Sequence, residues 1–162
     1  MKIEIFTVNY SDAQQAQDLV FLLEQYALDP MGGATALKQN VKDNLVAELA
    51  KLPHAFSVIC YVDGKPAGLT NCFETFSTFK CQPLINIHDV VVIADYRGLS
   101  ISTKMLQHVE NIANQRGCCK ITLEVLEGNQ VAKNAYLKFG FAGYELDPQM
   151  GKALFWEKPL SP

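Results

Sequence analysis

The chain has 162 residues, of which 49% are hydrophobic and 19% charged, and its formal net charge is −3. This composition is typical of a globular chain rather than a disordered one, and the length fits one domain covering residues 1–162. Because the balance is slightly acidic and no basic run occurs, a nucleic-acid partner is not expected.

The start of the chain and its cysteines indicate a cytoplasmic protein. The first residues, MKIEIFTVNYSD, include early acidic side chains and no long apolar core, so neither a signal peptide nor a membrane span is expected. The cysteines number five and none forms a CxxC pair, which predicts reduced thiols and no zinc or other metal site.

The first third of the chain predicts one strand and two helices. Alternating apolar residues indicate a strand over residues 2–8, and Ser11 or Asp12 can cap the helix that follows. The run Asp29-Pro30-Met31-Gly32-Gly33 breaks that helix. A second helix is predicted from Thr35, ending at Pro53.

The middle of the chain predicts strands. Residues 55–62 and 67–76 have a strand-like pattern, and Asp63-Gly64 joins them as a tight hairpin turn. After a polar connection, residues 85–93 form an apolar strand rich in β-branched side chains.

The last third alternates helices and strands. A helix begins near Ser100 and ends at Gly117, a second helix covers residues 129–139, and strands are predicted at 120–126, 140–146 and 153–158. This order predicts an α/β protein with a mixed central sheet and helices on both faces.

The segment Ile85 to Arg116 carries the first functional signal. A strand, the turn Ala94-Asp95-Tyr96-Arg97-Gly98 and a helix start follow one another there. Such a turn offers free backbone N–H groups and the positive end of the helix dipole to an anion, and a diphosphate is the obvious ligand.

The amino-acid sequence of this turn resembles the acyl-CoA loop of the GNAT superfamily of N-acyltransferases. That family has Arg/Gln-x-x-Gly-x-Gly/Ala, and this chain has Arg97-Gly98-Leu99-Ser100-Ile101-Ser102 after the strand His88-Asp89-Val90-Val91-Val92. A second run, from Asn129 through Tyr136 to Phe141, resembles the family's next motif. Ser100 and Ser102 depart from it, since the family prefers Gly, and Gly or Ala, there; serine narrows the room for a phosphate but is a good N-cap.

The resemblance implies a single-domain GNAT fold whose central parallel strands splay at an acyl-CoA site, and acetyl-CoA as co-substrate. The residues that it implies for cofactor binding are Arg97, Gly98, Leu99, Ser100, Ile101, Ser102 and Thr103 for the diphosphate, Val90, Val91 and Val92 for the pantetheine arm, and Asn129 and Tyr136 from the second motif. Each also has an ordinary structural interpretation, as a turn, a buried strand or a helix cap.

The catalytic candidates are Tyr136 and His88. A phenol keeps its proton at neutral pH and can give it to a leaving thiolate, and Tyr136 can otherwise be a core aromatic residue. His88 occupies the position of the family's strand glutamate and can act as general base or as a core histidine. Neighbours in a strand point to opposite faces, so His88 and Asp89 are not expected to act as a pair, and Glu74 or Glu124 could replace His88.

The acceptor is the least specified part of the site. In similar enzymes its pocket is built by the first helices and the later hairpins, which here contribute Tyr26, Asp29, Met31, Glu74, Phe76 and Phe79. Acidic and aromatic groups suit a cationic small amine, and the strand and loop most resemble diamine acetyltransferases. The alternatives are acetylation of a protein N-terminus or lysine, a non-catalytic acyl-CoA sensor, and an α/β domain that binds another nucleotide at its anion site. A homodimer is compatible with the resemblance, and His54 and His108 are expected to be exposed and without a catalytic role.

Overall fold

The computed structural model describes residues 1–161, and its contacts divide the chain into two compact units, Met1–Leu123 and Glu124–Pro162. None of the helices in residues 1–161 is both long and apolar enough to span a membrane.

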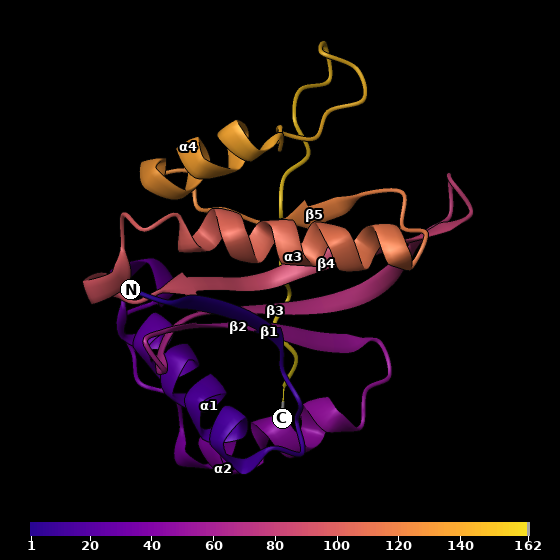
Figure 1. Cartoon of the computed structure of the whole chain (residues 1–162). Coiled ribbons are helices and arrows are strands. Elements are labelled where there is room, and N and C mark those ends of the chain that lie inside the picture. The colour runs from indigo at the N-terminus through magenta and orange to yellow at the C-terminus, as the bar shows by residue number, and fades with distance from the viewer. Residues whose placement is uncertain (162) are drawn as a thin grey trace. The chain divides into compact units, whose positions relative to one another are not determined.

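The first unit is built on one five-stranded sheet (Figure 1). Its strands lie in chain order, β1 (Ile3–Thr7), β2 (Ala55–Val62), β3 (Lys65–Ser77), β4 (Gln82–Val92) and β5 (Ile121–Leu123). The first four pair antiparallel, and β5 is parallel to β4. The predicted mixed α/β sheet is therefore confirmed.

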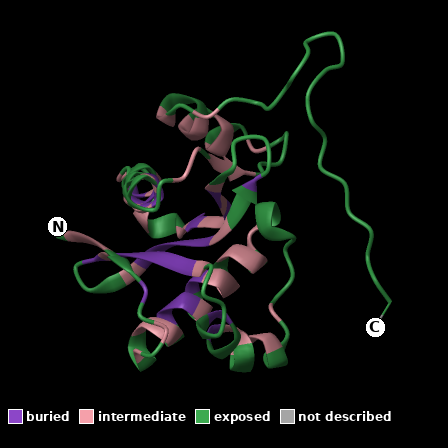
Figure 2. Cartoon of the chain, turned by 90° about the vertical axis from the view of Figure 1, so that its right-hand side faces the viewer, coloured by how far each residue is buried: buried purple, intermediate pink, exposed green. Residues whose placement is uncertain are grey.

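Helices cover both faces of this sheet, as predicted (Figure 1). On one face, helices α1 (Ala13–Leu28) and α2 (Gln39–Ala50) pack their apolar sides on the strands, whereas α3 (Ile101–Gln115) lies on the other face. Figure 2 shows that the buried residues are concentrated in the strands between these helices. The buried residues of the α1/α2 face include Leu19, Leu22, Val46, Leu49, Ile59, Leu69 and Val91.

The approach of α3 to the sheet depends on Gly68 of β3. A Cβ atom built on Gly68 would lie 3.0 Å from Ile101 Cγ2, 3.0 Å from Met105 Cε and 3.1 Å from the Val91 carbonyl oxygen. These distances are shorter than ordinary van der Waals contact, so a larger residue would push the N-terminal end of α3 away from β3 and β4. This glycine therefore positions the helix start that the sequence marks as an anion site.

Local capping signals locate four helix ends. Asp12 caps α1, since its Oδ1 accepts the backbone N–H of Gln15 at 2.9 Å. Asn129 caps α4 (Gln130–Phe139) in the second unit, and Gly140 ends that helix with φ +116°. Gly117, with φ +68°, follows the end of α3 as predicted.

The second helix begins later than predicted, at Gln39 and not at Thr35. The short helix η1 (Pro30–Gly32) is followed by Gly33 and Ala34, both with positive φ. The N–H of Thr35 then bonds back to the carbonyl of Ala27 at 3.0 Å, so the chain is tied to the end of α1 before it can turn into α2.

The C-terminal strands are the clearest error of the sequence prediction. β5 covers only Ile121–Leu123 instead of 120–126, and no strand forms at 140–146 or 153–158 within the described residues. Instead, this region has one isolated bridge, Glu145–Lys152, and a hydrogen bond from the Ala153 N–H to the Tyr144 carbonyl at 2.9 Å. A single bridge without further strands does not stabilise a ladder, which explains the difference.

Candidate active site

The loop before α3 presents a continuous run of unused donors. Among the described residues, no backbone N–H from Gly98 to Thr103 donates a hydrogen bond, whereas the preceding N–H of Arg97 and the following N–H of Lys104 both do. The space where a Cβ of Gly98 would stand is open to 4 Å. Together with the helix dipole, these groups form a cradle that fits a diphosphate.

Ser100 has an uncommon backbone conformation in this loop. Its φ of 58° and ψ of 26° place it in the left-handed region, and its side chain makes no capping hydrogen bond. The expectation that Ser100 acts as a side-chain N-cap is therefore wrong. The conformation also gives a physical reason for the family's glycine at this position, since an L side chain is disfavoured there.

Arg97 ties the loop to the end of α1. Its Nε donates to the carbonyl oxygen of Val92 at 3.2 Å, and its Nη2 lies 3.0 Å from Oδ2 of Asp29. The N–H of Met31 and then the Arg97 guanidinium hold the pKa of the Asp29 carboxyl below its usual range. Arg97 thus joins two loops that the sequence assigns separately to cofactor and acceptor.

The parallel pairing beside this loop is short. β4 and β5 pair only from Ile85–Ile121 to Ile87–Leu123, while β4 continues to Val92. The segment His88–Val92, which contains Val90, Val91 and Val92, therefore has no β5 partner in register. Val91 is buried against α1 and α2, and the backbone of this segment is the part that the resemblance assigns to the pantetheine arm.

A bulge in β4 changes the orientation of His88. Asn71 pairs with Asp89 but its neighbour Cys72 pairs with Ile87, so His88 is the extra residue on β4. The His88 ring lies 5.1 Å from the ring of Phe73, which packs on the α1/α2 core, and Asp89 bonds Asn71 on that same face. The expectation that His88 and Asp89 point to opposite faces is wrong, because the bulge interrupts the alternation.

The His88 ring is held from one side. Its Nδ1 lies 2.8 Å from the side-chain Oδ1 of Asn86, and Asn86 Nδ2 donates to Thr122 Oγ1 at 3.0 Å. Because an amide oxygen only accepts, this arrangement places a proton on Nδ1 and leaves the lone pair of a neutral ring on Nε2. Nε2 is therefore the atom that could accept a proton from a substrate.

Of the candidate acceptor residues, Tyr26 and Asp29 lie on the same side of the sheet as Asp89. Burial, followed by the charges of Asp89 and Asp29, raises the pKa of the Tyr26 phenol. Glu74, by contrast, lies on the α3 side, where its Oε2 accepts from Arg116 Nη1 at 2.9 Å. Glu74 therefore does not share a face with His88.

The remaining acceptor candidates lie in three different segments. Met31 belongs to η1, Phe76 lies near the end of β3, and Phe79 lies in the turn between β3 and β4, where its side chain is 90% exposed. Nothing in their contacts selects an acceptor.

The second unit carries Asn129 and Tyr136. Asn129 Oδ1 accepts the N–H of Ala132 at 3.2 Å, so the capping interpretation of this residue is confirmed. The Tyr136 ring packs edge-on against Phe141 at 5.9 Å between centroids. The assignment of both residues to acyl-CoA binding, and of Tyr136 to catalysis, stays a prediction. Glu124 as an alternative base and the cofactor-binding roles of the loop before α3 also stay predictions.

The other histidines and the cysteines have structural surroundings. His54 is exposed as expected, but His108 is half-buried, with its Nε2 3.0 Å from Thr7 Oγ1, and burial lowers the pKa of its ring. Cys60 and Cys72 are buried, and burial raises the pKa of Cys60 to about 11. Within residues 1–161, no cluster of three or more His, Cys, Asp or Glu could hold a metal.

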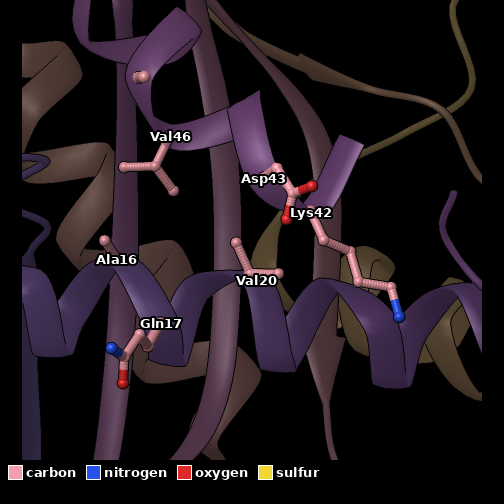
Figure 3. A pocket seen from close by; sticks show the side chains of 7 residues that line it. Ala16, Gln17, Val20, Lys42, Asp43 and Val46 are labelled. Carbon is pink, nitrogen blue, oxygen red and sulfur yellow. The ribbon is translucent and has the colours of Figure 1, made fainter. Parts of the chain in front are cut away.

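A groove on the outer surface lies apart from the loop. It has a volume of about 300 Å³ between α1 and α2, and Figure 3 shows Val20 and Val46 facing each other across it, with Lys42 and Asp43 at one end. None of the residues assigned to cofactor or catalysis lines it.

Comparison with known proteins identifies the family. A model described as "Acetyltransferase (GNAT) family" matches residues 16–141, which is more than half of the chain. The chain therefore belongs to the GNAT acetyltransferase family, as the loop and the second motif indicated.

The chain is similar to individual acetyltransferases over part of its length. The chain is 31% identical over 96 residues to thialysine N-epsilon-acetyltransferase of Bos taurus, covering 59% of this chain and 53% of that protein. It is 37% identical over 97 residues to N-alpha-acetyltransferase 50 of Danio rerio, covering 59% and 52%. The alignments thus span about half the length of these curated relatives.

The fold is also found in solved structures. AAC(6')-Iy, determined in complex with the bisubstrate analog CoA-S-monomethyl-acetylneamine, superposes with a TM-score of 0.78 at 14% identity, covering 99% of this chain and 100% of that one. This similarity confirms the predicted GNAT fold.

Proposed function

We propose that this protein is an acetyl-CoA-dependent N-acetyltransferase that acts on a small-molecule primary amine. The observation that carries the proposal is the run of unused N–H groups from Gly98 to Thr103 at the start of α3. Acetyl-CoA would supply the activated acetyl group, and its diphosphate is the anion that such a cradle suits.

In this proposal each part of the site has one task. The backbone of Val90 to Val92 orients the pantetheine arm and the thioester carbonyl, because this part of β4 has no β5 partner in register. His88, with its Nδ1 held by Asn86, takes a proton from the acceptor ammonium at Nε2. Tyr136 gives its phenolic proton to the leaving thiolate, and Asn129 supports the cofactor at the start of α4.

Two observations support a small cationic acceptor. Tyr26, Asp29 and Asp89 place a phenol and two carboxylates on the face that carries His88. The relative from Bos taurus is named for a small amino acid, thialysine. The relative from Danio rerio favours the second candidate, acetylation of a protein N-terminus.

We also propose a cytoplasmic location, and a homodimer that light scattering would detect.

The test is a panel of amines mixed with protein and acetyl-CoA, with release of free thiol as the readout. The panel contains thialysine, diamines, an aminoglycoside, lysine and short peptides with free N-termini. Turnover of thialysine or a diamine supports the proposal, and turnover of peptides alone would replace it with the second candidate. Acetyl-CoA binding without turnover of any amine would indicate a non-catalytic sensor.

A further inference from the structure

A chain of hydrogen bonds crosses three strands and ends on Asp89. Tyr10 Oη lies 2.8 Å from Ser57 Oγ, Ser57 Oγ donates to Asn71 Oδ1 at 2.6 Å, and Asn71 Nδ2 donates to Asp89 Oδ2 at 3.0 Å. Ser57 pairs with Asn71 across β2 and β3, and Asn71 pairs with Asp89 across β3 and β4. Ser57 and Asn71 are buried, with exposed fractions of 0% and 4%.

The direction of this chain follows from the chemistry of its ends. An ionised carboxylate only accepts hydrogen bonds, so Asn71 must turn its NH2 group toward Asp89 and its oxygen toward Ser57. Ser57 then uses its single proton on Asn71, and the remaining donor is the hydroxyl of Tyr10. Burial raises the pKa of Tyr10, so this hydroxyl keeps its proton at neutral pH. Every donor points toward Asp89.

The chain orients a carboxylate rather than moving protons. The amide of Asn71 is a poor proton carrier, and hydrogen bonds aligned in one direction strengthen one another. Within residues 1–161, Asp89 Oδ2 has this bond to Asn71, and no hydrogen bond to Asp89 Oδ1 is formed. One oxygen is therefore fixed and the other remains available to a ligand.

The position of Asp89 selects the ligand. The bulge places it on the same face as His88, one residue along the strand, and Tyr26 and Asp29 lie on that face. A carboxylate bonded to the reacting ammonium would oppose its deprotonation, because the negative charge favours the protonated amine. Asp89 is better suited to a second cationic group of the same acceptor, near the one that His88 would deprotonate.

We propose that Asp89 anchors a second, non-reacting ammonium of a compact diamine-like acceptor, and that Asn71, Ser57 and Tyr10 are positioning residues for this anchor. The inference rests on the proposed function and deepens it. It narrows the acceptor from a primary amine to a compact molecule with two amino groups.

The test compares two acceptors that differ by one amino group, 1,3-diaminopropane and propylamine. The wild type should favour the diamine in kcat/KM by about tenfold or more, since a hydrogen-bonded charge contributes that much. Asp89→Asn and Asn71→Leu should remove most of this preference through the KM of the diamine. Tyr10→Phe, three hydrogen bonds from Asp89, should reduce it about twofold to fivefold. The Kd of acetyl-CoA should stay unchanged in all three variants.

Tyr61→Phe is the matched control. Its hydroxyl also bonds a carboxylate on the α1 side of the sheet, Asp18 Oδ2 at 2.8 Å, but this pair is not connected to Asp89. A diamine preference that is absent from the wild type, or that survives Asp89→Asn and Tyr10→Phe, overturns the inference. If Asn71→Leu fails to fold, Asp89→Asn and Tyr10→Phe alone test the inference.

Failure of the proposed function gives a different result. In that case neither amine releases thiol, and calorimetry with CoA present measures the binding of the two amines directly. Tighter binding of the diamine that is lost in Asp89→Asn would still support the anchor. Equal or absent binding of both amines would overturn it.

Discussion

Replacing Ser100 by glycine should stabilise the protein, although the position is the start of a helix. Ser100 has φ 58° and no side-chain capping bond, so glycine removes strain and loses no cap. The left-handed conformation costs a non-glycine residue about 1–2 kcal/mol. The greater freedom of glycine in the unfolded chain offsets roughly half of this gain. We expect a net gain of about 0.5–1 kcal/mol, or a Tm higher by about 1–4 °C.

Ser102→Gly is the matched control, because Ser102 lies two residues later inside α3. At Ser102 there is no left-handed backbone strain for glycine to relieve, so the substitution should lower stability by roughly 0.5–1 kcal/mol. Urea denaturation of both variants measures the two signs side by side. Equal destabilisation by both substitutions would refute the reasoning about Ser100.

The same position tests the cradle. Ser100→Gly should bind acetyl-CoA as tightly as the wild type or more tightly, since the backbone becomes more accessible to phosphate oxygens. Ser100→Val should weaken binding, because a β-branched side chain disfavours this backbone conformation and fills the approach. Calorimetry measures both, and equal Kd values for glycine and valine would place the phosphates elsewhere.

Three further predictions follow from other parts of the structure. Tyr136→Phe should lower kcat by about 10²–10⁴-fold with nearly unchanged acetyl-CoA affinity, and undiminished turnover would leave Tyr136 as a packing residue. Gly68→Ala should cost about 1–3 kcal/mol in urea and weaken acetyl-CoA binding, because the new Cβ meets Ile101 and Met105. Gly128→Ala, whose Cβ would meet nothing within 4 Å, is its control. Burial lowers the pKa of His108, so the folded state resists protonation and stability should fall as pH drops below about 6.5. His108→Gln should make urea midpoints fall less steeply between pH 7 and 5; an unchanged slope would contradict this.

Local signals in the sequence predicted much of the fold. The boundaries of β2 are confirmed, and so are the caps at Asp12 and Asn129, because turn residues and side-chain caps act within a few positions. The predicted start of α2 at Thr35 was wrong. The hydrogen bond from the Thr35 N–H to the Ala27 carbonyl, which delays the helix, joins residues on either side of a turn. The strands predicted after Gly140 were wrong because strand formation requires a partner that periodicity cannot identify.

In the candidate site, too, local features were predicted and those that depend on distant residues were not. The anion loop was predicted from its strand, turn and helix start, and its N–H groups are indeed without acceptors in the described part of the chain. The effect of the bulge on the orientation of His88 was missed, since its position depends on the pairing of β3 with β4 and not on any residue in β4 alone. Gly68 and the chain from Tyr10 to Asp89 were also missed, because they join residues distant in sequence.

The central claim is that the backbone from Gly98 to Thr103 holds the diphosphate of acetyl-CoA. Amide NMR of ¹⁵N-labelled protein titrated with CoA tests it most directly, because each N–H of the loop gives its own signal. We expect the largest shifts and the strongest protection from exchange at these amides, followed by Val90 to Val92. Saturable binding whose largest changes lie elsewhere, or no change at millimolar CoA, would contradict it.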